Sequence, residues 1–333
     1  MRRFHFAAAF ALVLGGCATD NRAENDTARA KTVTQASFVT VDGIRLHYVD
    51  HGGSGAPLIL LAGMGHGAHV FDDFAPHFTD HFRVFALTRR GYGQSDKPPS
   101  GYDTETLASD LAGFMDALGM ARASLIGHSL AGGEMTVFAG RYPGRTDRLV
   151  YLDAAYDREQ LPELSEADPV GEPQPGPEDI ASVAKFEAWF ERALGFWSPA
   201  MARDLREMYQ APDGSLRPAT PGTVGQAVYA GMVAYRPDYR AVKAPALALY
   251  AIQIAPDLPA SADPALRARG QAFLDTVYAP WQREQAARFD TETACSKVVL
   301  LPGAHHYFFV QDGDQTARTV RSFLLDDQPC AES

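Results

Sequence analysis

The sequence lacks the features that would assign it to several common functional classes. Its 30 lysines and arginines stand against 41 acidic residues, which gives a formal net charge of −11. A surface of that sign repels phosphates, so we expect no nucleic acid partner. The chain has no Gly-x-x-x-x-Gly-Lys-Ser/Thr loop, so nothing indicates nucleotide binding. After its first twenty residues it has no apolar run long enough to span a membrane.

Metal-binding motifs are also missing. His47 and His51 are four residues apart, and so are His77 and His81. Neither pair has the intervening glutamate of a His-Glu-x-x-His zinc motif, and neither lies in a cluster of further ligands. We therefore interpret them as surface or core histidines, and we expect no metal and no cofactor.

The first twenty residues differ in composition from the rest. "MRRFHFAAAFALVLGGCATD" has a basic start and an apolar run over 4–14, which is too short to span a bilayer and is typical of an export signal. Its end, Leu14-Gly15-Gly16-Cys17, resembles a bacterial lipobox, which implies cleavage before Cys17 and a lipid on its sulfur. An ordinary cleaved signal peptide is the alternative. We expect a signal peptide over 1–16, a lipidated flexible tether over 17–36, and an exported protein held by its lipid on a membrane of the bacterial cell envelope, facing the periplasm and not the cytoplasm.

Cysteine is scarce, with three residues in the chain. Once Cys17 is set aside, Cys295 and Cys330 remain. An exported protein meets an oxidising compartment in which disulfides persist. One bridge between Cys295 and Cys330 is therefore the simplest expectation, and two free or buried thiols are the alternative.

Short apolar runs alternate with segments of helical periodicity along most of the chain. The apolar runs suit buried strands, while Leu107, Leu111 and Leu118 repeat at helical spacing. Asp42-Gly43 between two alternating runs indicates a tight hairpin. This order predicts an α/β fold, with a mostly parallel central sheet and helices on both faces. The expected strands are 57–63, 82–88, 123–127, 148–154, 244–252 and 297–303, and the expected helices are 104–119, 132–142 and 316–325.

Two stretches interrupt this pattern. Residues 158–180 are rich in proline and acidic residues, as loops are, and a second irregular stretch at about 255–280 precedes a further helix. Three aromatic-rich segments of helical pattern follow the first stretch, near 181–194, 199–209 and 223–235.

Ser129 in "LIGHSLAG" lies at the junction of an expected strand and an expected helix. A serine hydroxyl becomes a nucleophile when a base within hydrogen-bond reach takes its proton and an acid orients that base. A sharp strand-to-helix turn exposes the side chain, and it needs small residues because strand and helix pass close by. Gly127 and Ala131 lie two residues on either side of Ser129. The segment therefore has the pattern of a nucleophilic serine.

This pattern resembles the Gly-x-Ser-x-Gly motif of the α/β-hydrolase family, with Ala131 in place of the last glycine and Gly132 behind it. The segment "RRGYGQSD" resembles the family's Asp-x-Arg-Gly-x-Gly-x-Ser, with Thr88 in place of the aspartate, and we interpret it as a structural loop. The resemblance covers about residues 38–325. It implies a hydrolase core over 37–156 and 241–326 and a helical lid, or cap, over 157–240.

The resemblance also implies a histidine base after the last strand, because the family's chain order is serine, acid, histidine. Of the ten histidines, two follow Ser129, namely His305 and His306. In the family's Gly-x-Gly-His loop, His306 takes the histidine position and His305 that of the second glycine. We therefore prefer His306 as the base, with His305 as the alternative.

Two aspartates are candidates for the acid. Asp153 directly ends the expected strand 148–154, where some relatives keep the acid. Asp257 follows the strand 244–252, where most relatives keep it, but it comes later than the usual spacing. We place Asp153 slightly ahead and keep Asp257 as the alternative.

The developing oxyanion of acyl transfer needs preset N–H donors. The family resemblance implies that one is the backbone N–H of Leu130, directly after the nucleophile. The other comes from the loop after the strand 57–63, which reads Ala62-Gly63-Met64-Gly65 here and His-Gly in many relatives. We expect the Met64 N–H to be that second donor.

These residues predict a serine hydrolase that cleaves a carboxylic ester of a small, partly apolar substrate through an acyl-enzyme. Amide, thioester, lactone or carbon–carbon cleavage would use the same groups. A non-catalytic ligand-binding protein on a hydrolase scaffold is the alternative of another class. Aromatic and methionine side chains of the lid could line an acyl pocket or only pack the lid against the core; they are Phe186, Trp189, Phe190, Phe196, Trp197, Met201, Met208 and Tyr209.

Overall fold

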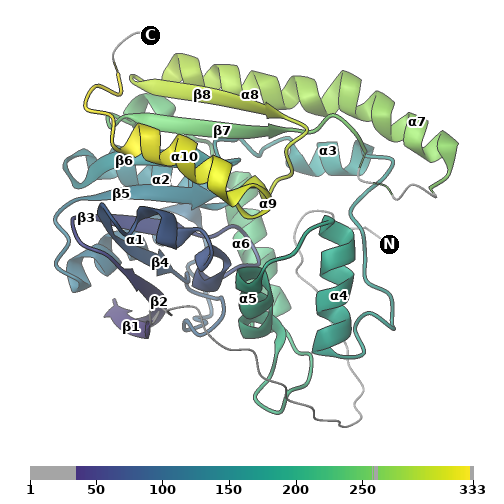
Figure 1. Ribbon diagram of the computed structural model, residues 1–333, viewed down its shortest axis with the longest axis horizontal. Helices are drawn as coiled ribbons and strands as arrows, with labels where there is room; N and C mark the ends of the chain where they lie inside the picture. Colours follow the sequence, from purple (N-terminus) through teal and green to yellow (C-terminus); the bar gives the residue numbers. More distant parts are fainter. Residues whose placement is uncertain (1–34, 257, 259–261, 331–333) are drawn as a thin grey trace.

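The computed structural model describes residues 35–256, 258 and 262–330 (Figure 1). The signal-peptide and lipidation predictions, including Cys17, and the alternative acid Asp257 lie outside the described residues. Eight strands form one sheet in the order β1-β2-β4-β3-β5-β6-β7-β8. The strands are β1 (Gln35–Val41), β2 (Ile44–Gly52), β3 (Ala56–Leu61), β4 (Phe82–Leu87), β5 (Ala123–His128), β6 (Thr146–Leu152), β7 (Ala246–Ile252) and β8 (Ser296–Pro302).

The sheet is antiparallel at one edge and parallel elsewhere. β1 and β2 form a hairpin, and β2 pairs antiparallel with β4. Asp42 and Gly43 both have positive φ, 47° and 79°, as a two-residue hairpin turn requires. From β4 through β3 and β5 to β8 every pairing is parallel. The expected mostly parallel sheet is therefore confirmed.

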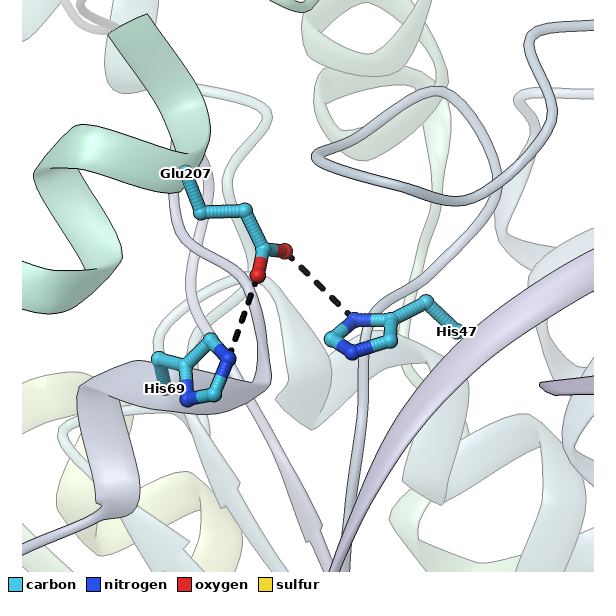
Figure 2. Close-up of side chains that lie close together, drawn as sticks. All are labelled: His47, His69 and Glu207. Carbon is cyan, nitrogen blue, oxygen red and sulfur yellow. Dashed lines mark ion pairs between the residues drawn. The ribbon is translucent and has the colours of Figure 1, made fainter. Parts of the chain in front are cut away.

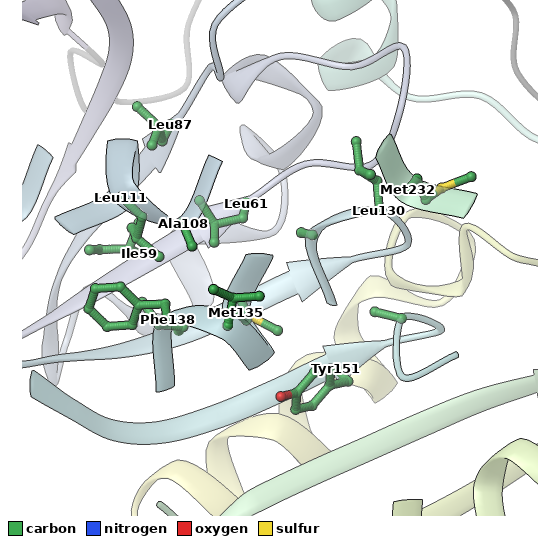
Figure 3. Packing of buried hydrophobic residues seen from close by; sticks show 14 of the residues in the cluster. Ile59, Leu61, Leu87, Ala108, Leu111, Leu130, Met135, Phe138, Tyr151 and Met232 are labelled. Atoms are coloured by element: carbon green, nitrogen blue, oxygen red, sulfur yellow. The ribbon is translucent and has the colours of Figure 1, made fainter. Parts of the chain in front are cut away.

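Helices cover both faces of the sheet. Successive residues of a strand point to opposite faces, so they pack against different helices. Ile59 and Leu61 belong to the buried cluster that also contains Met135 and Phe138, while Leu58 and Leu60 belong to a second buried cluster. Figure 3 shows the first cluster closely packed between strands and helices. The first cluster includes residues of α1 (Thr104–Ala117), α2 (Ala131–Arg141) and α8 (Ala279–Glu292), and the second includes residues of η1 (Ala68–Phe71), η2 (Ala75–Phe78), α9 (Phe308–Gln311) and α10 (Gly313–Leu324).

The segment between β6 and β7 carries four helices. Figure 1 shows α4 and α5 beside the sheet, at the end toward which the β7 and β8 arrows point. Three of the helices coincide with the expected segments 181–194, 199–209 and 223–235. We call this part, residues 157–240, the β6–β7 segment. Its helices are α3 (Leu161–Ala167), α4 (Val183–Leu194), α5 (Pro199–Tyr209) and α6 (Gly222–Ala234).

The expectation of an irregular stretch over 255–280 is wrong in its second half. α7 (Pro264–Phe273) continues through a π-helical turn (Leu274–Tyr278) directly into α8. Asp263 caps the start of α7 by accepting from the Ala265 N–H at 3.0 Å. Pro280 lies in the first turn of α8, and the π turn Leu274–Tyr278 leads into that helix without a break.

A disulfide joins Cys295 and Cys330, whose Cα atoms lie 5.3 Å apart. It ties the start of β8 to the segment that follows α10. None of the helices in the described part of the chain is long and apolar enough to cross a membrane.

Candidate active site

Ser129 lies in the turn between β5 and α2 and has a φ of +52°. A serine rarely adopts this left-handed conformation, so its surroundings must stabilise it. Its N–H donates to the Leu152 carbonyl at 3.2 Å, and its own carbonyl accepts from Gly132 N–H at 3.1 Å. The guanidinium of buried Arg158 also donates to the Ser129 carbonyl, at 2.9 Å. The turn is thus held from both sides, and such strain is common at functional residues.

Small residues let the strand and helix of this turn approach each other. A Cβ at Gly127 would lie 2.7 Å from the Met135 side chain and 3.0 Å from the Ala131 Cβ. A Cβ at Gly132 would overlap the backbone carbonyl of Ala154. The closest approach of α2 to the neighbouring backbone is therefore at Gly132, one residue after the Gly-x-Ser-x-Gly position of Ala131. Position 132 requires glycine, whereas position 131 accommodates alanine.

Asp153 and His306 are brought together from the ends of two different strands. The Nδ1 of His306 lies 2.6 Å from Oδ2 of Asp153. The other carboxylate oxygen of Asp153 accepts from the Tyr156 hydroxyl at 2.5 Å and from the Ala251 N–H at 3.0 Å. Because the carboxylate accepts a hydrogen bond from Nδ1–H, the ring proton stays on Nδ1 and Nε2 is the nitrogen that can accept a proton. This is the orientation that a general base next to a serine needs.

Asp153 itself has an unusual backbone, with a φ of +47°. Its side chain is 7% exposed, and its N–H donates to the Leu249 carbonyl at 2.8 Å. The neighbouring strands β6 and β7 therefore both fix this aspartate. Together with Ser129, it is one of three residues other than glycine with positive φ in the described part of the chain.

His305, the alternative base, faces a different environment. Its ring packs edge-on against Phe196 of the β6–β7 segment, with ring centroids 5.0 Å apart. Its Nδ1 accepts from the Tyr307 N–H at 3.1 Å. Burial lowers the pKa of His305 to about 4, with a further contribution from His306. His305 is therefore a neutral contact between the loop after β8 and the β6–β7 segment.

His128, between Gly127 and Ser129, is a site residue that the sequence argument did not single out. It is 1% exposed, its ring centroid lies 4.4 Å from that of His306, and its Nε2–H donates to the His306 carbonyl at 3.1 Å. Burial, and then the proximity of His306, hold the pKa of His128 well below its usual value. A neutral His128 thus holds the backbone of His306 in place through this hydrogen bond. The motif permits any residue at this position, so only the fold reveals this contact.

The two expected oxyanion donors are the N–H groups of Leu130, directly after Ser129, and of Met64, in the loop after β3. Among the described residues, no hydrogen bond uses the backbone N–H of either one. A Cβ at Gly63 would lie 3.1 Å from the Ser129 Cβ, so the loop that carries Met64 passes directly over the serine. Both N–H groups are therefore available to an oxygen bound next to Ser129.

Arg89 holds this loop in place and was also missed as an individual residue. It donates to the carbonyl of Ala62 at 2.5 Å and to that of Gly63 at 3.0 Å. Its charge is balanced by Glu134 of α2 at 2.6 Å, and both side chains are at most 5% exposed. Because Arg89 takes the carbonyls just before Met64, it fixes the direction of the next N–H. The "RRGYGQSD" loop is thus structural, as expected, and through Arg89 it is bonded directly to the loop that carries Met64.

One cavity of about 670 Å³ contains Met64, Ser129, Asp153 and His306 in its wall. A cavity of this size suits a small-molecule ligand. Phe186 and Met208 are buried instead in the packing of the β6–β7 segment, and Phe196 contacts His305. The other expected lid residues do line the cavity; they are Trp189, Phe190, Trp197, Met201 and Tyr209.

Comparisons with known proteins agree with this fold. The model of the alpha/beta hydrolase fold family matches residues 56–216, just under half of the chain. The 2-(acetamidomethylene)succinate hydrolase of Mesorhizobium japonicum is 27% identical over 275 residues, which cover 82% of this chain and 89% of that protein. A non-heme chloroperoxidase of Streptomyces lividans is 38% identical over 121 residues, or 35% of this chain and 44% of that one.

Solved structures show the same fold at lower identity. The crystal structure of E-2-(acetamidomethylene)succinate hydrolase superposes with a TM-score of 0.68 at 23% identity, over 87% of this chain and 99% of that one. The enol-lactonase of Burkholderia xenovorans superposes with a TM-score of 0.58 at 22% identity, over 87% of this chain and all of that one. From the strand order, the family match and these neighbours, the chain has the α/β-hydrolase fold.

Proposed function

We propose that this protein is a serine hydrolase in which Ser129 is the nucleophile, His306 the base and Asp153 the acid. The observation that carries the proposal is the 2.6 Å hydrogen bond between His306 and Asp153, in the wall of the same cavity as Ser129. A serine on a tight strand-to-helix turn and an acid-oriented imidazole are the two parts that acyl transfer requires.

In this proposal the Ser129 hydroxyl attacks the substrate carbonyl while Nε2 of His306 takes its proton. The N–H groups of Leu130 and Met64 donate to the resulting oxyanion. His306 then passes the proton to the leaving group, which breaks the acyl bond and leaves Ser129 acylated. Water, deprotonated by the same imidazole, attacks the acyl-enzyme and releases the acid.

The substrate we propose is a carboxylic ester of a small, partly apolar molecule. The cavity volume and its aromatic wall support this size and polarity. Amide, thioester, lactone and carbon–carbon bonds remain in the same proposal, because they need the same groups. Relatives named as a succinate-derivative hydrolase and as an enol-lactonase support testing acidic acyl compounds and lactones beside simple esters.

The first experiment is covalent labelling by a fluorophosphonate probe of a protein that begins at residue 18. We expect wild type to be labelled and Ser129→Ala to stay unlabelled. Ser124→Ala, a change at a buried serine of β5, the strand that precedes Ser129, serves as the control and should label like wild type. If the folded wild type stays unlabelled, a non-catalytic ligand-binding protein becomes the better interpretation.

We also propose that the protein is exported and anchored by a lipid on Cys17, with residues 17–36 as its tether. The disulfide between Cys295 and Cys330 supports an oxidising compartment, since such bonds rarely persist in the cytoplasm. Metabolic labelling with a radioactive fatty acid should mark wild type and not Cys17→Ala. Equal labelling of the two proteins would contradict the proposal.

A further inference from the structure

A cluster of three side chains joins the β6–β7 segment to the core, away from Ser129. His47 comes from β2, His69 from η1 and Glu207 from α5 (Figure 2). One ligand atom of each residue lies within 4.8 Å of the other two. We call these three residues the His-Glu cluster. None of the three lines the cavity that contains Ser129.

Two separations in the cluster equal those between neighbouring ligands of a metal ion. Nδ1 of His47 lies 3.4 Å from one carboxylate oxygen of Glu207, and Nε2 of His69 lies 3.2 Å from the other. In a tetrahedral zinc site with bonds of about 2.0 to 2.2 Å, neighbouring ligand atoms lie about 3.3 to 3.5 Å apart. Both separations match this value, each to a different oxygen of Glu207, and all three ligand atoms lie within 4.8 Å of one another, so small side-chain movements would bring them around one ion.

Polar atoms in the cluster lack partners. The His47 side chain is completely buried and that of Glu207 is 8% exposed. Within the described part of the chain, Oε1 of Glu207, the oxygen that faces Nδ1 of His47, has no hydrogen-bond partner. A buried carboxylate oxygen without a partner costs free energy, which a bound cation would offset.

The surroundings of the cluster also resemble the outer partners of a metal site. Nδ1 of His69 lies 3.0 Å from Oδ2 of Asp72, which leaves Nε2 to face Glu207. Histidines that bind metals commonly donate their other N–H to a carboxylate in this way. Asp72 is in turn paired with Arg203 of α5, and Gln94 donates to Glu207 at 3.1 Å. Two imidazoles, each losing any extra proton when it binds, and one carboxylate form a ligand set that suits Zn²⁺.

We propose that the His-Glu cluster binds a divalent cation of the zinc class, which fixes α5 to the hydrolase core. The nearby hydroxyl of Thr88, 3.0 Å from Nδ1 of His47, or a water can complete the coordination. α5 also carries Met201, Leu205 and Tyr209 of the cavity wall. The ion therefore holds one wall of the substrate cavity without taking part in the chemistry at Ser129.

The competing interpretation is a site that holds a proton instead of a metal. Burial lowers the pKa of His69, but its hydrogen bonds to Asp72 and Glu207 outweigh that effect and raise the pKa to about 9. A protonated His69 would then bridge the two carboxylates. Zinc binding would displace this proton, and a proton-only site would show no metal binding.

The test is isothermal titration of the chelator-treated protein with ZnCl₂, with thermal unfolding as a second readout. We expect wild type to bind one equivalent of Zn²⁺ and to unfold at a higher temperature when loaded. Glu207→Gln, which keeps the shape of the side chain, should lose both effects. His77→Gln changes a histidine outside the cluster, 3.5 Å from Asp314, and should behave like wild type.

Two further measurements do not depend on how well Glu207→Gln folds. Asp72→Asn keeps the three ligands and should weaken zinc binding by about 10- to 100-fold. Co²⁺ added to wild type should give the visible absorption bands of a tetrahedral site. Absence of these bands, or equal zinc binding by wild type and Glu207→Gln, would overturn the proposal and favour the proton-only site. Fluorophosphonate labelling of Ser129 does not require this ion, so failure of one proposal leaves the other standing.

Discussion

Nδ1 of His306 lies 2.6 Å from Oδ2 of Asp153, across 153 residues of sequence. Asp153 follows β6 and His306 follows β8, and β7 lies between these strands in the sheet. The loop after β8 must therefore reach over the end of β7. The Ala251 N–H of β7 donates to the other oxygen of Asp153, so the intervening strand helps to orient the pair.

The carboxylate of Asp153 should be required for fast reaction at Ser129. Asp153→Asn replaces the acceptor of the His306 Nδ1–H with a group that can favour the wrong tautomer. In a serine protease the equivalent change lowers kcat by about 10⁴-fold, and we expect a loss of that order in the fluorophosphonate labelling rate. Asp257→Asn is the comparison and should keep most of the rate. If the two variants react equally fast, the assignment of the acid is wrong.

The two adjacent histidines should respond differently to the same substitution. His306→Gln removes the proposed base and should abolish labelling of Ser129. His305→Gln should retain it, because the His305 ring contacts Phe196 and accepts from Tyr307 N–H instead of facing Asp153. The labelling rates of both variants are measured, and circular dichroism checks that each variant folds. If only His305→Gln lost labelling, His305 and not His306 would be the base.

Arg89 should affect both stability and rate, and a paired variant separates the two effects. Arg89→Met leaves Glu134 buried without its partner, which typically costs about 3 to 5 kcal/mol of unfolding free energy. Arg89→Met with Glu134→Gln should recover much of that stability in urea unfolding. In both variants the labelling rate should remain below that of wild type, by up to about 10²- to 10³-fold. The reason is that the Ala62 and Gly63 carbonyls lose their donor, so the direction of the Met64 N–H is no longer fixed. Full recovery of the rate in the double variant would show that Arg89 acts through stability alone.

Gly132 should tolerate no side chain. In Gly132→Ala the new Cβ would overlap the Ala154 carbonyl, so we expect a loss of about 1 to 3 kcal/mol in unfolding free energy and slower labelling of Ser129. Gly144→Ala is the control, because nothing lies within 4 Å of a Cβ there. Similar unfolding free energies for both variants would contradict the close approach of α2 to the end of β6.

The disulfide should stabilise the C-terminal part of the hydrolase core. Cys295 and Cys330 are separated by 35 residues, and a bridge over such a loop contributes about 2 to 4 kcal/mol. Cys330→Ser, or wild type with reductant, should unfold at correspondingly lower urea concentration. The reductant should have no further effect on Cys330→Ser, and two free thiols in untreated wild type would disprove the bridge.

Much of the fold could be predicted because its signals are local. The apolar runs of the central strands, the Asp42-Gly43 turn and the periodicity of 104–119 each reflect a few neighbouring residues. The helix after residue 280 was predicted and is α8, whereas α7 and the π turn were missed because proline and charged residues mask their pattern.

The site could be predicted only in part, because it depends on contacts between distant segments. Ser129 and His306 follow from a motif and from chain order, while the choice between Asp153 and Asp257 stayed open in the sequence. The His-Glu cluster could not be predicted from the sequence for a different reason. The spacing of His47 and His51 argued against zinc, but the partners that the fold supplies to His47 are His69 and Glu207, from other elements.

The position of Asp153 has a consequence for how this protein can change. In the proposed mechanism the acid is Asp153, which follows β6, so the chain that leaves β7 is not required to position a catalytic carboxylate. That chain still contributes Gln253, Ile254 and Pro256 to the cavity wall. Insertions, deletions and substitutions after β7 can therefore reshape the substrate cavity while the serine, imidazole and carboxylate keep their geometry, which makes this loop a natural place for new specificities to evolve or be engineered.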